Sequence, residues 1–134
     1  MKLITRDTDY AIRALMYMAK RPERVVSAKE LVDELEIPRA FLRRLLQVLS
    51  RKKILRSLKG KGGGFLLNRP PGKIGVADVI KIFQGSTDII DCMFKKALCP
   101  DVGRCPLRRE IKKIEKGVQR GLSRITVSLL VQGL

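Results

Sequence analysis

Hydrophobic residues recur at helical spacing three times within the first fifty positions of the chain. The segments 8–20 and 28–35 each carry one apolar face, and a third helix follows Pro38, which suits a first helical turn. Ser27 and Glu30 form a capping-box pattern: the serine hydroxyl accepts from the glutamate backbone amide, and the glutamate reaches back to the serine amide. Two short helices joined by a tight turn, the second rich in arginine, are typical of a helix-turn-helix. The apolar stripe of the third helix consists of Phe41, Leu42, Leu45, Leu46 and Leu49.

The pattern that follows the third helix predicts a β-hairpin. Residues 54–58 and 65–67 are expected to be short strands, and the glycine-rich segment 60–64 lies between them. Glycine permits positive φ there and lets the backbone approach a phosphate or a narrow groove. A hairpin directly after a helix-turn-helix is a wing, although a merely flexible, solvated hairpin has the same pattern.

The remaining apolar pattern predicts two more helices. Residues 76–83 form a short one. From Leu107 to Leu129 apolar residues are spaced three or four positions apart, which predicts a single long helix over 107–134. This stripe could pack on its own domain, but a basic terminal helix of this length more naturally pairs with a second copy of the chain. The expected interface residues are Ile111, Ile114, Val118, Gly121, Leu122 and Ile125.

Together these elements predict a mainly α-helical fold with a small β-hairpin. A winged helix-turn-helix domain is expected over residues 1–84, a loop over 85–106 and a dimerisation helix over 107–134. No apolar run reaches the roughly 18–20 residues that a bilayer span needs. The opening MKLITRDTDY places charges where a signal peptide needs an apolar segment, so we expect a cytoplasmic protein with no membrane partner.

The net charge of the chain indicates a class of binding partner. The 134 residues carry 29 Lys and Arg against 13 Asp and Glu, a formal net charge of +16, which favours a polyanionic partner. Residues 38–73 contain eleven basic residues and no acid, so the charge is concentrated on the helix-turn-helix and wing. Arginines of the third helix suit guanine edges, and the wing suits a minor groove or phosphates. The candidate DNA contacts are Ser27, Lys29, Arg39, Arg43, Arg44, Lys59, Lys61, Gly62 and Gly63.

The loop between the last two helices contains every cysteine of the chain. Cys92, Cys99 and Cys105 have the spacing C-x6-C-x5-C, and the chain has no histidine. Zinc usually takes four ligands from Cys and His, so structural zinc is disfavoured. An iron-sulfur cluster accepts three thiolates and an oxygen ligand at its fourth position. Reduced inert thiols, and redox-active or disulfide-forming thiols, are the alternatives.

These residues resemble a known family, the Rrf-type winged-helix regulators, which include the iron-sulfur repressors IscR and NsrR. The resemblance covers nearly the whole chain: the start M-K-L-I-T-R-D-T-D-Y-A-I-R-A-L, the wing K-G-K-G-G-G-F-L-L, the helix start V-A-D-V-I, the three-cysteine loop and the closing I-T-V-S-L-L-V. It implies that the long helix clamps a dimer and that the cysteine loop of one subunit lies against the first helix of the other.

The resemblance also implies the fourth cluster ligand. IscR-like members use a histidine shortly after the third cysteine, and this chain has none. NsrR-like members use an aspartate in a Thr-Asp motif, which Thr8-Asp9 matches, so Asp9 is the implied ligand, with Asp7 as the fallback. A plain helix-capping role for Asp9 is the alternative. Arg43 replaces an acidic base-reading residue of IscR-like proteins, so their target sequence does not transfer.

The resulting hypothesis is a homodimeric transcription regulator, a repressor and not an enzyme. It would read a palindromic DNA operator under the control of a 2Fe-2S or 4Fe-4S cluster that senses nitric oxide, redox state or iron supply. A cluster-free or thiol-based regulator of the same family is one alternative. A basic RNA-binding domain is another, against which stands the 4% aromatic content.

Overall fold

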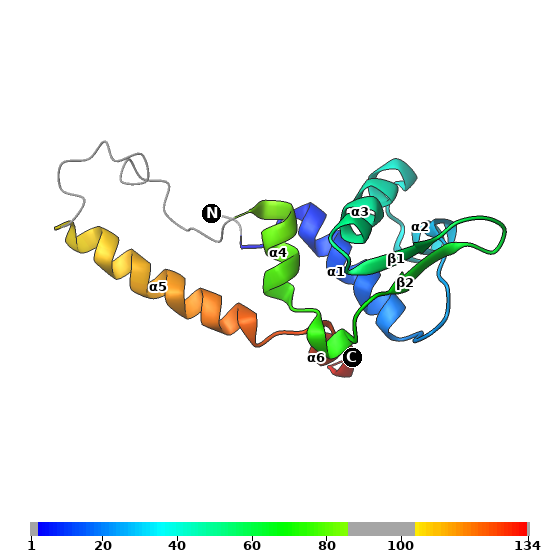
Figure 1. The fold of residues 1–134 in the computed structure, drawn as a ribbon. Coiled ribbons are helices and arrows are strands. Elements are labelled where there is room, and N and C mark those ends of the chain that lie inside the picture. Colours follow the sequence, from blue (N-terminus) through cyan, green and yellow to red (C-terminus); the bar gives the residue numbers. More distant parts are fainter. Residues whose placement is uncertain (1–2, 86–103, 134) are drawn as a thin grey trace.

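The computed structural model describes residues 3–85 and 104–133. The expected fold class is confirmed, because a helical body carries one two-stranded antiparallel hairpin (Figure 1). The elements in chain order are α1 Arg6–Ala19, α2 Ala28–Leu35, α3 Arg39–Arg51, β1 Leu55–Leu58, β2 Gly64–Leu67, the 3-10 turn η1 Pro71–Lys73, α4 Val76–Gln84, α5 Pro106–Ser123 and α6 Val127–Gln132.

The core forms around α1 and α3. Ala11 and Leu15 of α1 are fully buried, and the small alanine side chain lets the neighbouring helices approach α1 closely. The predicted stripe of α3 is confirmed in four of its five positions, and Phe41 is half-buried at the edge of the core. The buried stripe residues are Leu42, Leu45, Leu46 and Leu49.

The hairpin is extended by a segment that the sequence pattern did not reveal. Val26 forms an antiparallel bridge with Phe65: its amide donates to the Phe65 carbonyl at 3.0 Å, and the Phe65 amide donates back at 2.8 Å. Gly64 permits this approach, since a Cβ there would lie 2.5 Å from the Val26 carbonyl oxygen. The wing is thereby held beside the start of α2.

The prediction of a single long helix over 107–134 is wrong beyond Ser123, where α5 ends. The chain leaves the helix there, and Thr126 bridges Gly75; the Val76 amide donates to Ile125 and the Val127 amide donates to Ile74, both at 2.9 Å. Thr126 then caps α6, accepting from the Leu129 amide at 3.1 Å. The break places Val127 in the core, where it is fully buried.

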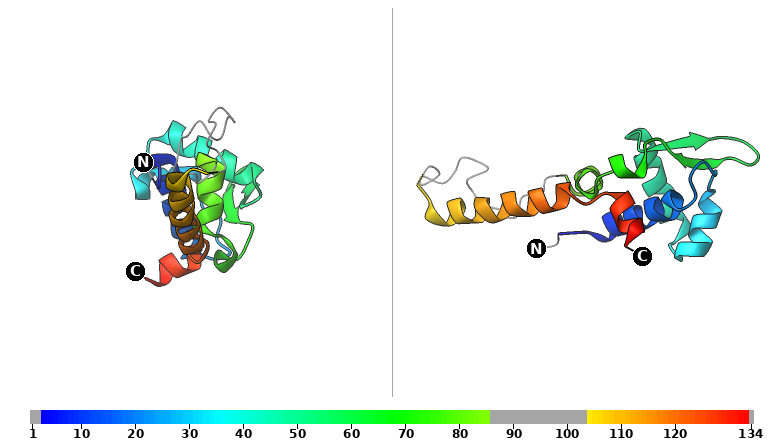
Figure 2. Two further views of the ribbon diagram at one scale, coloured as in Figure 1. Left: turned by 90° about the vertical axis from the view of Figure 1, so that its left-hand side faces the viewer. Right: turned by 90° about the horizontal axis from the view of Figure 1, so that it is seen from below.

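The six expected dimer residues therefore differ in how much of their surface is left for a second protomer. Leu122 is buried in its own protomer, and Val118 and Ile125 pack against the same core. Ile111 is half-buried, whereas Ile114 and Gly121 are exposed. Towards its first turn α5 leaves the body, so that this turn and the wing lie at opposite ends of the molecule (Figures 1 and 2).

The last residue of α4 holds the start of α1. The Gln84 side-chain carbonyl accepts from the Thr5 amide at 2.9 Å and from the Thr8 hydroxyl at 2.7 Å, and its NH2 group donates to Leu3 at 3.2 Å. Thr8 is fully buried, so these bonds also satisfy a polar group that has lost contact with water.

Leu46→Ala tests this account of the core. Truncating a fully buried leucine leaves a cavity, and we expect a loss of about 2–5 kcal/mol in the free energy of unfolding. Leu129→Ala makes the same chemical change at a side chain that is 50% exposed, and should cost far less. Urea unfolding at one fixed protein concentration measures both changes; equal losses in the two variants would contradict this assignment of the core.

Candidate nucleic-acid interface

The solvent-facing side of α3 carries a ridge of polar side chains four residues apart. Arg39, Arg43, Gln47 and Arg51 are all exposed, while the leucines face the core. Among the described residues, no carboxylate lies within ion-pair distance of the three arginines. The ridge therefore presents uncompensated positive charge along one line of the helix.

A sharp turn presents this ridge. Glu36 ends α2 in the left-handed conformation at φ 55°, and its amide donates to the Val32 carbonyl at 3.0 Å. Ile37 then turns into the core, where it is 2% exposed, and Pro38 directly precedes α3. The expected helix-turn-helix is thus present between α2 and α3.

A cleft of about 610 Å³ separates α3 from the wing. Arg43, Gln47 and Arg51 of the ridge line one side, and Ser57 and Phe65 of the hairpin line the other. Because its walls supply guanidinium groups, an amide and a hydroxyl, the cleft can accept a phosphate-bearing strand.

The wing tip projects into solvent, as expected for a groove contact. Lys59 and Lys61 are exposed, and Gly62 has φ 77° with no atom within 4 Å of the position a Cβ would take. Gly63 lies just behind the tip and donates its amide to Gly60 at 3.0 Å. The tip backbone is therefore open to an approaching sugar-phosphate chain.

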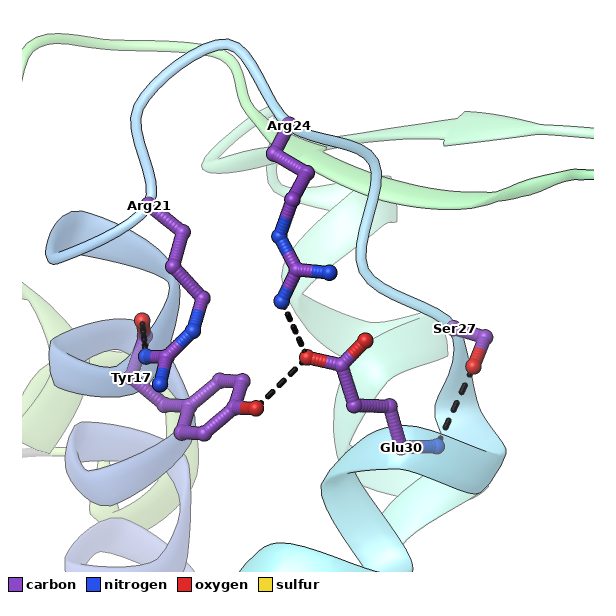
Figure 3. Close-up of polar contacts among 5 residues, drawn as sticks. All are labelled: Tyr17, Arg21, Arg24, Ser27 and Glu30. Atoms are coloured by element: carbon purple, nitrogen blue, oxygen red, sulfur yellow. Dashed lines mark hydrogen bonds and ion pairs between the residues drawn. The ribbon is translucent and has the colours of Figure 1, made fainter.

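The start of α2 is the third part of this surface. Ser27 accepts from the Glu30 amide at 3.1 Å, which confirms the cap, and Lys29 is exposed beside it. The glutamate does not reach back to Ser27 as the capping box predicted. Its carboxylate faces Tyr17 and Arg24 instead (Figure 3).

The Glu30 contacts tie α2 to α1 and to the loop between them. Tyr17 donates to the Glu30 carboxylate at 2.5 Å, and Arg24 forms an ion pair with the same oxygen. The hydrogen bond from Tyr17 lowers the pKa of Glu30 and raises the pKa of Tyr17, because it favours the carboxylate and the neutral phenol. Glu30 thus fixes the orientation of the helix whose first turn carries Ser27 and Lys29.

Arg44 differs from the other predicted contacts on α3. Its guanidinium lies 3.4 Å from the Asp7 carboxylate and over the Phe41 ring, 4.8 Å from its centroid. Tyr10 packs edge-on against the same ring at 5.6 Å. Arg44 therefore joins the start of α1 to α3, and its charge is shared with Asp7.

The predicted cluster ligands are only partly within the described residues. Cys92 and Cys99 lie outside them, and Cys105 is a half-buried free thiol directly before α5. Asp9 lies in the first turn of α1, half-exposed, with an ion pair to Arg13 at 3.0 Å. In Figure 1 and in the right-hand view of Figure 2 the start of α5, which directly follows Cys105, lies far from α1, so one protomer does not bring Cys105 and Asp9 together. Among the described residues, no three Cys, Asp or Glu side chains are grouped as for a metal ion.

Comparison with known proteins agrees with this arrangement of elements. Residues 4–133 match Rrf2, described as an iron-dependent transcriptional regulator. The chain belongs to the Rrf2 family. A relative from Rhizobium meliloti (strain 1021), protein aau3, is 30% identical over 130 residues, which are 96% of this chain and 84% of that protein.

Two solved structures share the Rrf2 fold. CymR (YrzC), the global cysteine regulator of B. subtilis, has a TM-score of 0.84 at 22% identity, and the match covers 100% of this chain and 99% of that one. T. potens IscR has a TM-score of 0.73 at 23% identity, covering 99% of this chain and 88% of that one.

Family membership makes the chain a DNA-binding transcription regulator and not an enzyme. The resemblance noted in the sequence is confirmed for the Rrf2 family as a whole, and a closer kinship to NsrR-like members stays a prediction. Within the described residues, no helix combines the length and apolarity that crossing a bilayer requires.

The sequence pattern left part of the candidate interface unpredicted. Gln47 and Arg51 continue the four-residue spacing of Arg39 and Arg43, so helical periodicity alone could have found them. Ser57 faces the cleft because it pairs with Phe65 across the hairpin, and only the strand register reveals that.

Glu30→Gln tests the link between α1 and α2. A carboxylate whose pKa is lowered in the folded protein stabilises it above the unfolded pKa, about 4.3, and loses this effect as pH falls through the folded pKa. The wild type should therefore exceed Glu30→Gln in free energy of unfolding at pH 6, and the difference should shrink below pH 4. Urea unfolding across this range, with Asp33→Asn on the same helix as control, measures it; a difference independent of pH would contradict the assigned ionic role.

Proposed function

We propose that the chain is a homodimeric, cytoplasmic repressor that reads a palindromic duplex through α3 and the wing. The observation that carries this proposal is the cleft between the arginine ridge and the hairpin, whose cations have no acidic partner among the described residues. Releasing DNA counterions favours binding at such a surface.

Each part of the surface has a proposed role. Arg39 and Arg43 read base edges in the major groove, where a guanidinium can donate two hydrogen bonds to guanine. Lys59, Lys61 and the open glycine Gly62 contact the minor groove and phosphates, with Gly63 just behind them. Ser27 and Lys29 contact the backbone at the start of α2, while Arg44 braces α3 against α1.

The exposed apolar side chains in the first half of α5 are the support for the proposed dimer. Leu107 and Ile114 are 65% and 57% exposed, and with Ile111 they continue the apolar stripe beyond the part that packs on the protomer core. A second copy packed in a two-fold arrangement would cover this stripe and present two copies of α3 to a palindrome.

The proposed regulator is an iron-sulfur cluster held by Cys92, Cys99 and Cys105 with Asp9 of the partner subunit. The donor set fits, because Cys105 is only half-buried, between Arg104 and Arg108 in the sequence, and the Asp9 side chain is 44% exposed. When bound, a cluster would supply a state that depends on redox conditions and iron. Nitric oxide, oxidants or iron scarcity are the proposed signals, and a cluster-free thiol regulator is the alternative.

Arg43→Ala tests base reading. A duplex selected from a random pool by the wild type should lose about 1–3 kcal/mol of affinity, while a scrambled duplex loses much less. Lys59→Ala should weaken both duplexes alike and lower the salt slope by about one. Arg120→Ala on α5 removes the same charge as a control. Equal losses on both duplexes for Arg43→Ala would contradict base reading, and tighter binding to duplex RNA than to the selected DNA would contradict the proposal itself.

Mixed dimers test the shared cluster. Cys105→Ala and Asp9→Ala homodimers should each lose iron, sulfide and visible absorption when isolated without oxygen. A dimer of one Cys105→Ala chain and one Asp9→Ala chain retains one complete ligand set if Asp9 acts across the dimer.

The mixed dimer should therefore recover half of the wild-type iron and sulfide. If it remains colourless while the wild type is coloured, Asp9 does not complete the partner's site. A colourless wild type after reconstitution with iron and sulfide favours the cluster-free regulator.

A further inference from the structure

A second cavity lies on the other face of the wing. Successive residues of a strand point to opposite faces, so the pair Ser57 and Phe65 lines the cleft beside α3, while the adjacent pair Arg56 and Leu66 lines this cavity. Its volume is about 470 Å³, within the roughly 300–1,000 Å³ typical of small-molecule sites. The end of α1, the following loop and the base of the hairpin line it, and one side is open to solvent.

The cavity has an excess of positive charge. Arg21, Arg24, Arg56 and Arg69 line it, against one carboxylate, that of Glu23. Of these four, Arg24 alone forms an ion pair with another described residue, Glu30. The remaining guanidinium groups gather around a shared hollow, where an anion would relieve their mutual repulsion.

The guanidinium groups differ in how many of their donors already contact the protein, and this determines which of them could bind an anion. Arg21 lies over the Tyr17 ring at 3.6 Å from its centroid and donates to the Tyr17 carbonyl at 2.9 Å (Figure 3). Arg56 and Arg69 have no ion pair or hydrogen bond to another described side chain, and both are exposed. These two have all of their donors available to a ligand.

Apart from Asn68, the rest of the wall is apolar. The Leu66 side chain faces the cavity, Met18 lies at its floor with only 2% of its surface exposed, and Pro70 and Pro71 contribute at one end. An inorganic ion would leave this surface in contact with water, whereas a ligand with a hydrocarbon portion would cover it. The wall therefore favours an anion that also has an apolar part.

We infer that this cavity binds a small organic anion whose carboxylate or phosphate pairs with Arg56 and Arg69 and whose apolar part packs on Leu66, over the buried Met18 at the floor. The occupant would touch the end of α1, the loop before α2 and the wing strand together. This site shares no lining residue with the proposed DNA cleft and does not include Cys105, so the inference does not depend on the proposed cluster.

Methyl NMR tests this inference on the full-length protein. The chain has methionines at 1, 16, 18 and 93, of which Met18 lines the cavity and Met16 does not. With ¹³C-methyl methionine, titration with hexanoate or with hexyl phosphate should shift the Met18 signal saturably and leave the Met16 signal nearly unchanged. Hexanol and inorganic phosphate should each bind at least about tenfold more weakly, since one lacks the charge and the other the apolar part.

A double variant assigns the charge. Arg56→Ala with Arg69→Ala should weaken hexanoate or hexyl phosphate binding at least about tenfold, because two charge-assisted contacts are lost. Arg109→Ala with Arg120→Ala removes the same charge from exposed positions on α5 and should change little. A response to one anion only identifies the head group and supports the site. No saturable Met18 shift with either anion, equal binding of hexanol, or equal weakening in both double variants would overturn the inference.

Discussion

The arrangement of the proposed DNA-binding surface, formed by α3, the wing and the start of α2, depends on one pair of backbone hydrogen bonds, between Val26 and Phe65. It joins the residue before the Ser27 cap to the second wing strand, so the start of α2 and the wing move as one unit. Without it, a two-stranded hairpin would be only marginally stable. The glycine at position 64 is required because any side chain there would collide with the Val26 carbonyl. The wing therefore needs its glycines for packing as well as for its turn.

The few acids of this basic half of the molecule contribute by holding arginines in place. Glu30 holds Arg24 and orients α2, and Asp7 holds Arg44 and joins α1 to α3. Exposed pairs of this kind add little stability. Their effect is geometric: they hold Arg24 and Arg44 in contacts between elements, whereas Arg39, Arg43 and Arg51 remain available to a polyanion.

Local periodicity predicted the helices and hairpin well, because each buries its own stripe or pairs with its neighbour in sequence. It failed at residues 124–126, where the apolar spacing of Leu122, Ile125 and Leu129 continues although the helix stops. The break arises from a distant segment, since residues 74–76 offer backbone partners that no local pattern reveals. Glu30 behaves likewise: the sequence predicted its backbone contact with Ser27, while its side chain follows Tyr17, thirteen positions away.

The break between α5 and α6 bears on how the cysteine segment could be coupled to the proposed DNA-binding surface of α3 and the wing. The bridge between Thr126 and Gly75 holds the end of α5 beside α4, so the rest of α5 projects as an arm. At 1.5 Å per residue over 18 residues, its first turn lies about 27 Å from the anchored end. Residues 86–103 join this arm to Gly85, directly after Gln84. Along the chain, that segment connects to the described helices through α5 at one end and through Gln84 at the other. The second route is short, because Gln84 binds Thr5 and Thr8, and the adjacent Asp7 holds Arg44 of α3. Coupling through Gln84 therefore requires only a shift in the first turn of α1.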